Sequence, residues 1–119
     1  MQFVDGRTLR GFPRDDRRRI VTFVRDAAAG VESAHAHAIV HRDLKPDNLM
    51  VDEAGRVYVM DFGLARPVEK ASGMTASGMA VGTPSYMSPE QARGELADAR
   101  SDVYGMGATL YELLAGRPP

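Results

Sequence analysis

The chain has 119 residues, of which 44% are hydrophobic and 26% are charged, so it is long enough for one domain at most. Its 15 basic and 16 acidic residues almost cancel, which excludes a strong overall field for attracting nucleic acid or a membrane surface. The absence of cysteine excludes disulfides and favours a cytoplasmic location, and no apolar run reaches the roughly 20 residues of a membrane span.

The first part of the chain is predicted to hold a short strand and a long helix. Residues 1–4 are mostly apolar and precede Asp5 and Gly6, a pair suited to a tight turn. Residues 13–38 place apolar side chains at three- and four-residue steps, which predicts a helix with one buried face. That face comprises Ile20, Phe23, Val24, Ala27, Val31 and Ala34.

Polar residues of this helix are assigned to its solvent side or to its end. Arg17, Arg18 and Arg25 are expected to point into solvent. His35 and His37 are two residues apart and lie on different helix faces, so they cannot share a metal ion. We interpret the two histidines as an ordinary helix end.

The segment HRDLKPDN, residues 41–48, places an acid, a lysine and an amide within six residues. These are Asp43, Lys45 and Asn48. A proton acceptor, a fixed cation and an oxygen ligand for a metal are what phosphoryl transfer requires, because that chemistry depends on positioning and on neutralising oxygen charge. The segment is therefore predicted to be an active-site loop.

A β-hairpin is predicted directly after this loop. Residues 49–51 form one strand, residues 52–55 the turn and residues 56–60 the return strand, which delivers Asp61, Phe62 and Gly63. The hairpin brings Asp61 next to Asn48, so two oxygen ligands would face one Mg²⁺ ion.

The remaining residues are predicted to form a loop and a second helix. Residues 64–81 have no clear period and indicate a mobile loop. Residues 101–115 predict a helix with Ser101 as its cap and Asp102 in its first turn, where an acid favours the helix dipole. Its apolar stripe is Val103, Met106, Leu110, Leu113 and Leu114.

HRDLKPDN, the DFG of residues 61–63, the GT of residues 82–83 and the SPE of residues 88–90 occur in an order that resembles the eukaryotic-type serine/threonine protein kinases of bacteria. The resemblance implies an α+β fold, a mostly helical large lobe with a small β-hairpin. Residues 1–119 would be a partial kinase domain, with hinge, long helix, catalytic loop, activation segment and following helix. No glycine-rich loop, strand lysine or final helices are found, so the expected fold is incomplete and its small-lobe partner is missing.

The resemblance also implies roles for individual residues. Asp43 would orient the substrate hydroxyl and accept its proton, Lys45 would contact the transferred phosphate, and Thr83 would bridge the two. ATP would be held by backbone groups near Gln2 and Val4, with Lys45, Asn48 and Asp61 toward its phosphates and Mg²⁺. Met50 would lie beneath the adenine or belong to the core. The implied phosphorylation sites are Thr75 and Ser77, and the structural supports are His41, Arg42, Phe62, Gly63, Glu90 and Asp102.

The expected function is transfer of the ATP γ-phosphoryl group to serine or threonine hydroxyls of a protein, in bacterial signalling. Two alternatives stay open at this point. One is an inactive kinase remnant or pseudokinase that acts as an interaction module. The other is a small-molecule phosphotransferase, which would not be expected to carry Thr83 and the SPE stretch. The chain by itself is expected to be inactive.

Overall fold

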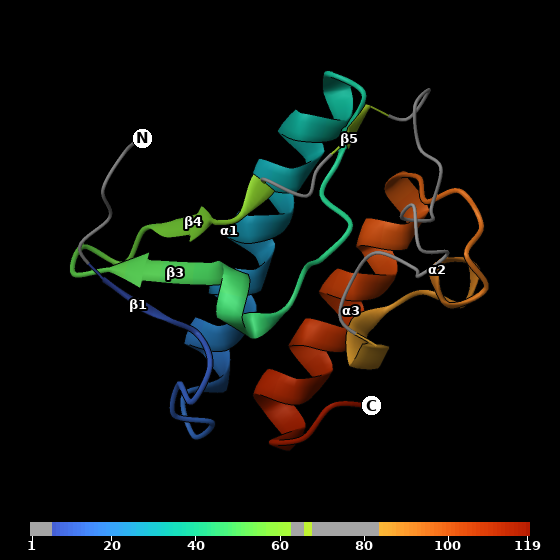
Figure 1. Cartoon of the computed structure of the whole chain (residues 1–119). Helices are drawn as coiled ribbons and strands as arrows, with labels where there is room; N and C mark the ends of the chain where they lie inside the picture. The colour runs from blue at the N-terminus through green and yellow to red at the C-terminus, as the bar shows by residue number, and fades with distance from the viewer. Residues whose placement is uncertain (1–5, 63–65, 68–83) are drawn as a thin grey trace.

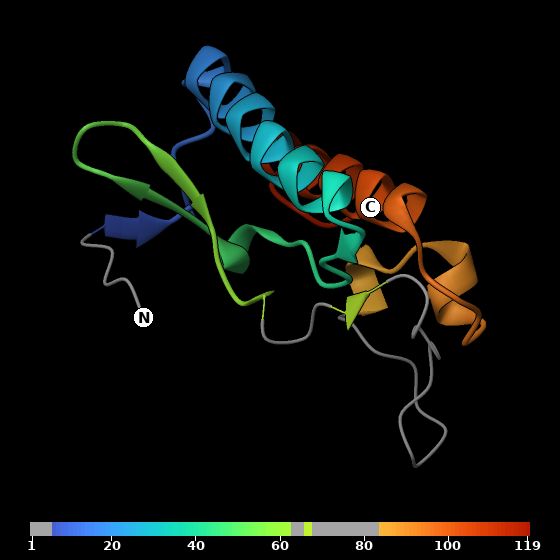
Figure 2. The ribbon, with the colours of Figure 1, turned by 90° about the horizontal axis from the view of Figure 1, so that it is seen from above.

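The computed structural model describes residues 6–62, 66–67 and 84–119. Two helices, α1 (Arg17–Ala36) and α3 (Ala99–Ala115), lie side by side and form one layer, and a small sheet packs beside α1 (Figures 1 and 2). This arrangement confirms the predicted α+β fold with a β-hairpin. Several predicted site residues lie outside the described residues: Gln2, Val4, Gly63, Thr75, Ser77 and Thr83.

The main sheet contains β1 (Gly6–Thr8), β3 (Leu49–Asp52) and β4 (Val57–Val59), joined antiparallel in the order β1-β3-β4. The hairpin of β3 and β4 is as predicted, and its register pairs Leu49 with Val59. The turn predicted to include Gly6 is wrong, because Gly6 already pairs with Asp52 in β1. A Cβ atom there would collide with the carbonyl oxygen of Val51, so Gly6 permits a close strand approach.

A second, smaller sheet corrects the prediction of a mobile loop over residues 64–81 at residues 66–67; residues 64–65 and 68–81 lie outside the described residues. Strand β5 (Arg66–Pro67) pairs antiparallel with β2 (Ile39–Val40), the strand that leads into the segment 41–48. A strand of two residues is too short to produce a hydropathy pattern in the sequence. Because β5 forms only by pairing with β2, its local sequence does not predict it.

Helix α1 begins at Arg17, four residues later than predicted, because Asp16 caps it by accepting a hydrogen bond from the Arg19 N–H at 3.3 Å. Its buried face is the predicted one, except that Ala34 is only half-buried. The helix ends at Ala36, and Ala38 then takes a left-handed conformation with φ of 58°. The helix therefore stops two residues before the predicted end, and the chain turns away at an alanine in a conformation that favours glycine.

Helix α3 begins two residues earlier than predicted, and its cap is Asp98 instead of Ser101. The two residues form a reciprocal capping box, with Ser101 at the third helical position. The predicted stripe is partly wrong, because Val103 is 68% exposed whereas Gly105 and Thr109 are buried. Gly105 lets the helix approach Leu44 of the segment 41–48 closely.

The core joins the helices to the sheet and to the segment 41–48. It includes Phe12, Ile20, Phe23, Val24, Ala27, Val31, Leu44, Leu49, Met106 and Leu113. Two short elements, η4 (Pro84–Tyr86) and α2 (Pro89–Ala92), precede α3 in the chain, and Ser88 caps α2. Within the part of the chain that the structure describes, no helix has the length and apolar character needed to cross a membrane.

Candidate active site

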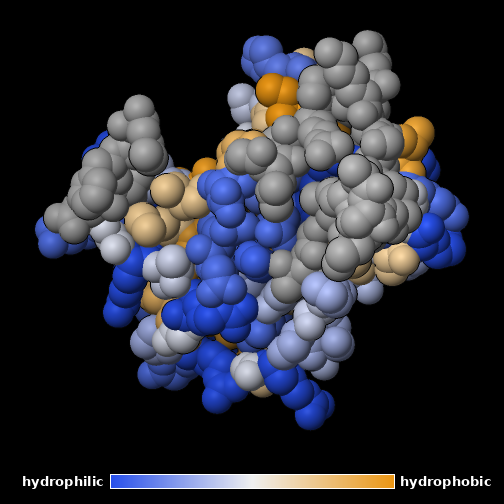
Figure 3. Space-filling model, viewed as in Figure 1, coloured by the Kyte–Doolittle hydropathy of each residue, from blue (hydrophilic) through white to orange (hydrophobic). Residues whose placement is uncertain are grey.

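The segment 41–48 runs from β2 to β3 and ends in the single turn η1 (Pro46–Asn48). Two hydrogen bonds close it into a compact loop. The Asn48 side-chain Nδ2 donates to the Asp43 carbonyl at 2.7 Å, and the Asn48 N–H donates to the Lys45 carbonyl at 2.9 Å. Hydrophilic residues occupy the middle of the molecular face seen in Figure 1 (Figure 3). The loop therefore presents polar groups from a fixed backbone.

The acid and the lysine predicted for catalysis lie together in this loop. The Asp43 side chain is only 8% exposed, and its Oδ2 lies 3.5 Å from the Lys45 Nζ, whose side chain is 23% exposed. The loop thus holds a nearly buried carboxylate beside an ammonium group whose side chain is partly exposed to solvent. Such a pair can take a proton from a hydroxyl and neutralise charge on a neighbouring phosphate.

His41 is fully buried and uses both ring nitrogens. Its Nδ1 accepts a hydrogen bond from the Asp43 N–H at 3.1 Å. Nε2 must then carry the hydrogen, and it donates to the Met60 carbonyl at 2.8 Å. The Phe62 ring meets the imidazole edge-on at 4.6 Å between centroids. Because both ring nitrogens are hydrogen-bonded, His41 supports the backbone of the loop and has no nitrogen available to act as a base.

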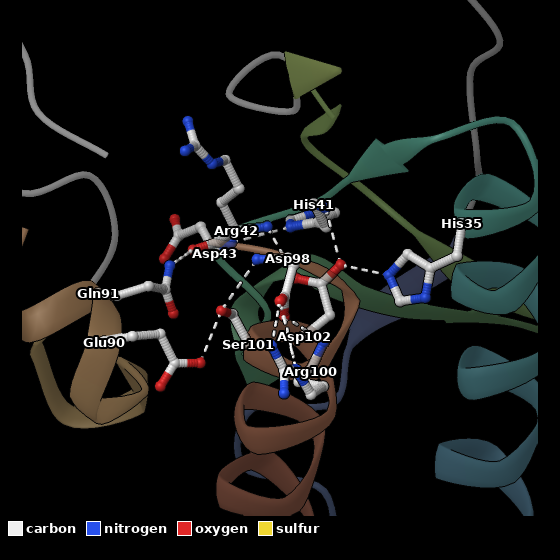
Figure 4. Close-up of polar contacts among 10 residues, drawn as sticks. All are labelled: His35, His41, Arg42, Asp43, Glu90, Gln91, Asp98, Arg100, Ser101 and Asp102. Atoms are coloured by element: carbon white, nitrogen blue, oxygen red, sulfur yellow. Dashed lines mark hydrogen bonds and ion pairs between the residues drawn. The ribbon is translucent and has the colours of Figure 1, made fainter. Parts of the chain in front are cut away.

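Asp102 at the start of α3 anchors the loop backbone. It accepts hydrogen bonds from the His41 N–H at 2.8 Å and the Arg42 N–H at 2.9 Å, and it is 2% exposed. The resemblance names Asp102 as a structural support, and in the structure its carboxylate holds the backbone of the loop. His35 of α1 adds a third contact, Nε2 to Asp102 Oδ2, at 2.7 Å (Figure 4).

The sequence predicts only an ordinary helix end at His35 and does not reveal its contact with Asp102. One signal was present in the pattern: His35 follows Val31 by four residues and so extends the buried face of α1. Its partner is 67 residues away, and no local pattern connects the two.

The hairpin brings the backbone near the two predicted metal ligands, Asn48 and Asp61, together. The Met60 N–H donates to the Asn48 carbonyl at 2.7 Å, so Asp61 follows the residue that is paired with Asn48. Asp61 is exposed, and its backbone adopts a left-handed conformation with φ of 64°. Because the Asn48 amide nitrogen is bonded to Asp43, its oxygen is the atom that remains for a cation.

The Asn48 amide oxygen and the Asp61 carboxylate are too few to hold a cation alone, and they suit a hard cation that also binds oxygens of a ligand. Among the residues that the structure describes, no three His, Cys, Asp or Glu side chains converge on a metal site. An amide and a carboxylate oxygen would need further oxygens from phosphate or water, which is typical of Mg²⁺. Met50, two residues after Asn48 on β3, is half-buried.

Glu90 of α2 is held by α3. Its Oε1 accepts a hydrogen bond from the Ser101 hydroxyl at 2.8 Å. Hydrogen bonding from its own backbone N–H, and then from Ser101, lowers the pKa of Glu90 below its usual value. In the described structure Ser101 holds this carboxylate.

Arg10 connects the loop to α3, a contact the sequence did not reveal. Its Nε lies 2.6 Å from Asp47 Oδ1, and its guanidinium donates to the Tyr86 hydroxyl at 2.8 Å and lies 3.2 Å from Glu112. The hydrogen bond to Asp47 raises the pKa of Arg10 above its usual value. A hollow of about 440 Å³ lies beside this cluster.

Comparisons with known proteins agree on one family. Residues 2–119 match the model of the protein kinase domain. The chain is 46% identical over 124 residues to serine/threonine-protein kinase PknB of Mycolicibacterium smegmatis. It is 47% identical to a probable serine/threonine-protein kinase of Corynebacterium efficiens and 46% identical to one of Bifidobacterium longum. All of the chain is covered in each comparison, and it spans about a fifth of each relative's length.

Proposed function

This chain belongs to the protein kinase family, and from that premise we propose that the protein containing it transfers the γ-phosphoryl group of ATP to serine or threonine hydroxyls of a protein substrate. One observation carries the proposal. The Asp43 carboxylate is nearly buried, lies 3.5 Å from the Lys45 ammonium and belongs to a loop that Asp102 anchors. Such a rigid acid and cation suit a reaction that depends on positioning.

The loop residues take distinct parts in this transfer. Asp43 orients the acceptor hydroxyl and takes its proton, as the hydroxyl oxygen bonds to the γ-phosphorus and the bond to the ADP oxygen breaks. Lys45 neutralises charge on the transferred phosphoryl oxygens. Thr83, outside the described residues, is proposed to bridge Asp43 and Lys45, as it would in this family.

Cofactor binding is proposed for residues on both sides of the hairpin. Asn48 and Asp61 would hold Mg²⁺ through their side-chain oxygens, and Met50 would lie below the adenine. When bound, the metal neutralises the phosphate oxygens. Backbone groups near Gln2 and Val4, which lie outside the described residues, are proposed to bind the adenine edge.

The test uses the full-length protein, γ-labelled ATP, Mg²⁺ and casein as a general acceptor. Wild-type protein should label casein on serine or threonine, and Asp43→Asn should lower kcat at least about 100-fold, because it removes the proton acceptor. Glu53→Gln, which removes an exposed acid from the hairpin turn, is the matched control and should keep kcat. Wild-type protein that labels nothing, or an Asp43→Asn variant with full activity, would refute the proposal.

Regulation and location complete the proposal. A phosphate on Thr75 or Ser77 would be met by the Arg42 guanidinium and would order the surrounding segment. Peptide mapping after incubation with ATP and Mg²⁺ tests this, and label found only elsewhere would contradict it. We place the domain in the cytoplasm, where ATP is present and a chain without cysteine needs no oxidising compartment.

A further inference from the structure

Gln91 of α2 lies in a buried position against the active-site loop. Its side chain points from α2 toward Arg42, as Figure 4 shows. Gln91 is 6% exposed, and its Nε2 donates a hydrogen bond to the Arg42 carbonyl at 2.9 Å. The contact joins residues 49 positions apart in the sequence. It connects the segment around α2 directly to the residue that precedes Asp43.

The surroundings determine how the Gln91 amide is oriented. Its Oε1 accepts hydrogen bonds from the Ser88 N–H and the Ser88 hydroxyl, each at 3.2 Å. A reversed amide would place an oxygen against the Arg42 carbonyl and an N–H against the Ser88 N–H. Neither arrangement forms a hydrogen bond. The position therefore requires a donor toward Arg42 and an acceptor toward Ser88.

The carbonyl that Gln91 binds belongs to the peptide unit between Arg42 and Asp43. The N–H of that same unit is the Asp43 N–H, which donates to His41 Nδ1 at 3.1 Å. Both polar groups of the unit are thus bonded, one on each side. The Arg42 backbone is in the left-handed region, with φ of 81°, a conformation that is strained for a residue other than glycine. Such a conformation persists only when its neighbours hold it.

We infer that Gln91 is a positioning residue for the catalytic acid. By fixing the plane of the peptide unit that leads into Asp43, it sets the direction in which the Asp43 carboxylate projects. It also links the placement of residues 84–92 to the geometry of the loop. The inference rests on the proposed kinase function, because it concerns the efficiency of that reaction.

The decisive variant is Gln91→Glu in the full-length protein. Its carboxylate still accepts from the Ser88 N–H, which preserves the cap of α2, but when ionised it cannot donate to the Arg42 carbonyl. At neutral pH we expect kcat to fall about tenfold, equivalent to about 1.4 kcal/mol, with KM for ATP within about twofold. Relative to wild type at each pH, kcat should recover as pH falls, because the protonated carboxyl regains a donor.

Two further variants separate positioning from simple stability. Gln91→Met keeps the side-chain volume and should lose the same activity without recovering it at lower pH. Ser88→Ala removes the capping hydroxyl, one of the two donors to Gln91 Oε1, but keeps the Ser88 N–H, which still fixes the amide orientation, so its kcat should stay within about twofold of wild type. Urea unfolding of each variant shows whether it is folded under the assay conditions.

The outcomes distinguish this inference from the function on which it rests. A wild-type protein without transferase activity overturns the proposed function. An active wild type whose Gln91→Glu and Gln91→Met variants both have unchanged kcat at neutral pH overturns the positioning role. Equal losses in Ser88→Ala and Gln91→Glu, with no recovery at low pH, also overturn it, because the residue would then act only through the helix cap.

Discussion

Asp102→Asn replaces one side-chain oxygen by nitrogen and is expected to destabilise the fold strongly. The carboxylate accepts from the His41 N–H, the Arg42 N–H and His35 Nε2. An asparagine has one oxygen, so when that oxygen accepts from Arg42, its NH₂ group faces the His41 N–H. A buried N–H without an acceptor costs about 1 to 3 kcal/mol, and the loss of charge-assisted bonding adds about 1 kcal/mol.

The sum is about 3 kcal/mol, a large part of the roughly 5 to 15 kcal/mol that stabilises a typical domain. Urea unfolding of the complete kinase domain measures it, and kcat should fall in parallel because the loop loses its anchor. His35→Ala is the matched control: Asp102 keeps both backbone donors, so the loss should be about 1 kcal/mol. If Asp102→Asn and His35→Ala were equally destabilised, the backbone tether would not be the important contact.

Local geometry supports three further predictions. Ala38→Gly should stabilise the protein by about 0.5 kcal/mol in urea unfolding, because relief of the left-handed strain exceeds the added chain entropy; a destabilised variant would contradict this. The pKa of Glu90 is lower in the folded protein than in the unfolded chain, so its contribution to stability is fully present above the unfolded pKa of 4.5 and is lost as pH falls through the folded pKa. Ser101→Ala should therefore weaken the acid dependence of the urea midpoint. An unchanged dependence would count against this explanation. Met106→Ala, at a 9% exposed position, should cost about 2 to 4 kcal/mol while Val103→Ser stays within about 0.5 kcal/mol, and equal losses would show that the face of α3 is misassigned.

The features that depend on local pattern could be predicted from the sequence. Those predictions, the α+β fold, the hairpin, the buried face of α1 and the protein kinase family, are confirmed. Each depends on residues close together in the chain, such as Val24 and Val31 on one helix face, or on a contiguous motif. Hydropathy and spacing record such relations directly.

The features that depend on distant partners could not be predicted. His35 and Asp102 are 67 residues apart, and Gln91 and Arg42 are 49 apart, and a single polar residue has no periodicity. The stripe of α3 was misassigned at Val103 for a related reason. The face of α3 that meets the loop contains Gly105 and Thr109, whose small or polar side chains do not register as hydrophobic. The roles assigned to the site residues remain predictions.

The tether from Asp102 to the His41 and Arg42 backbone also sets an order of events during synthesis. The bonded residues are 61 and 60 positions apart. At about 5 to 20 residues per second, the loop is synthesised about 3 to 12 seconds before its anchor. During that interval the HRDLKPDN sequence is complete, but the acceptor for its two backbone N–H groups does not yet exist. The loop therefore acquires its native geometry only after translation has passed α3, so a nascent chain stalled before residue 102 would carry the motif without its anchor.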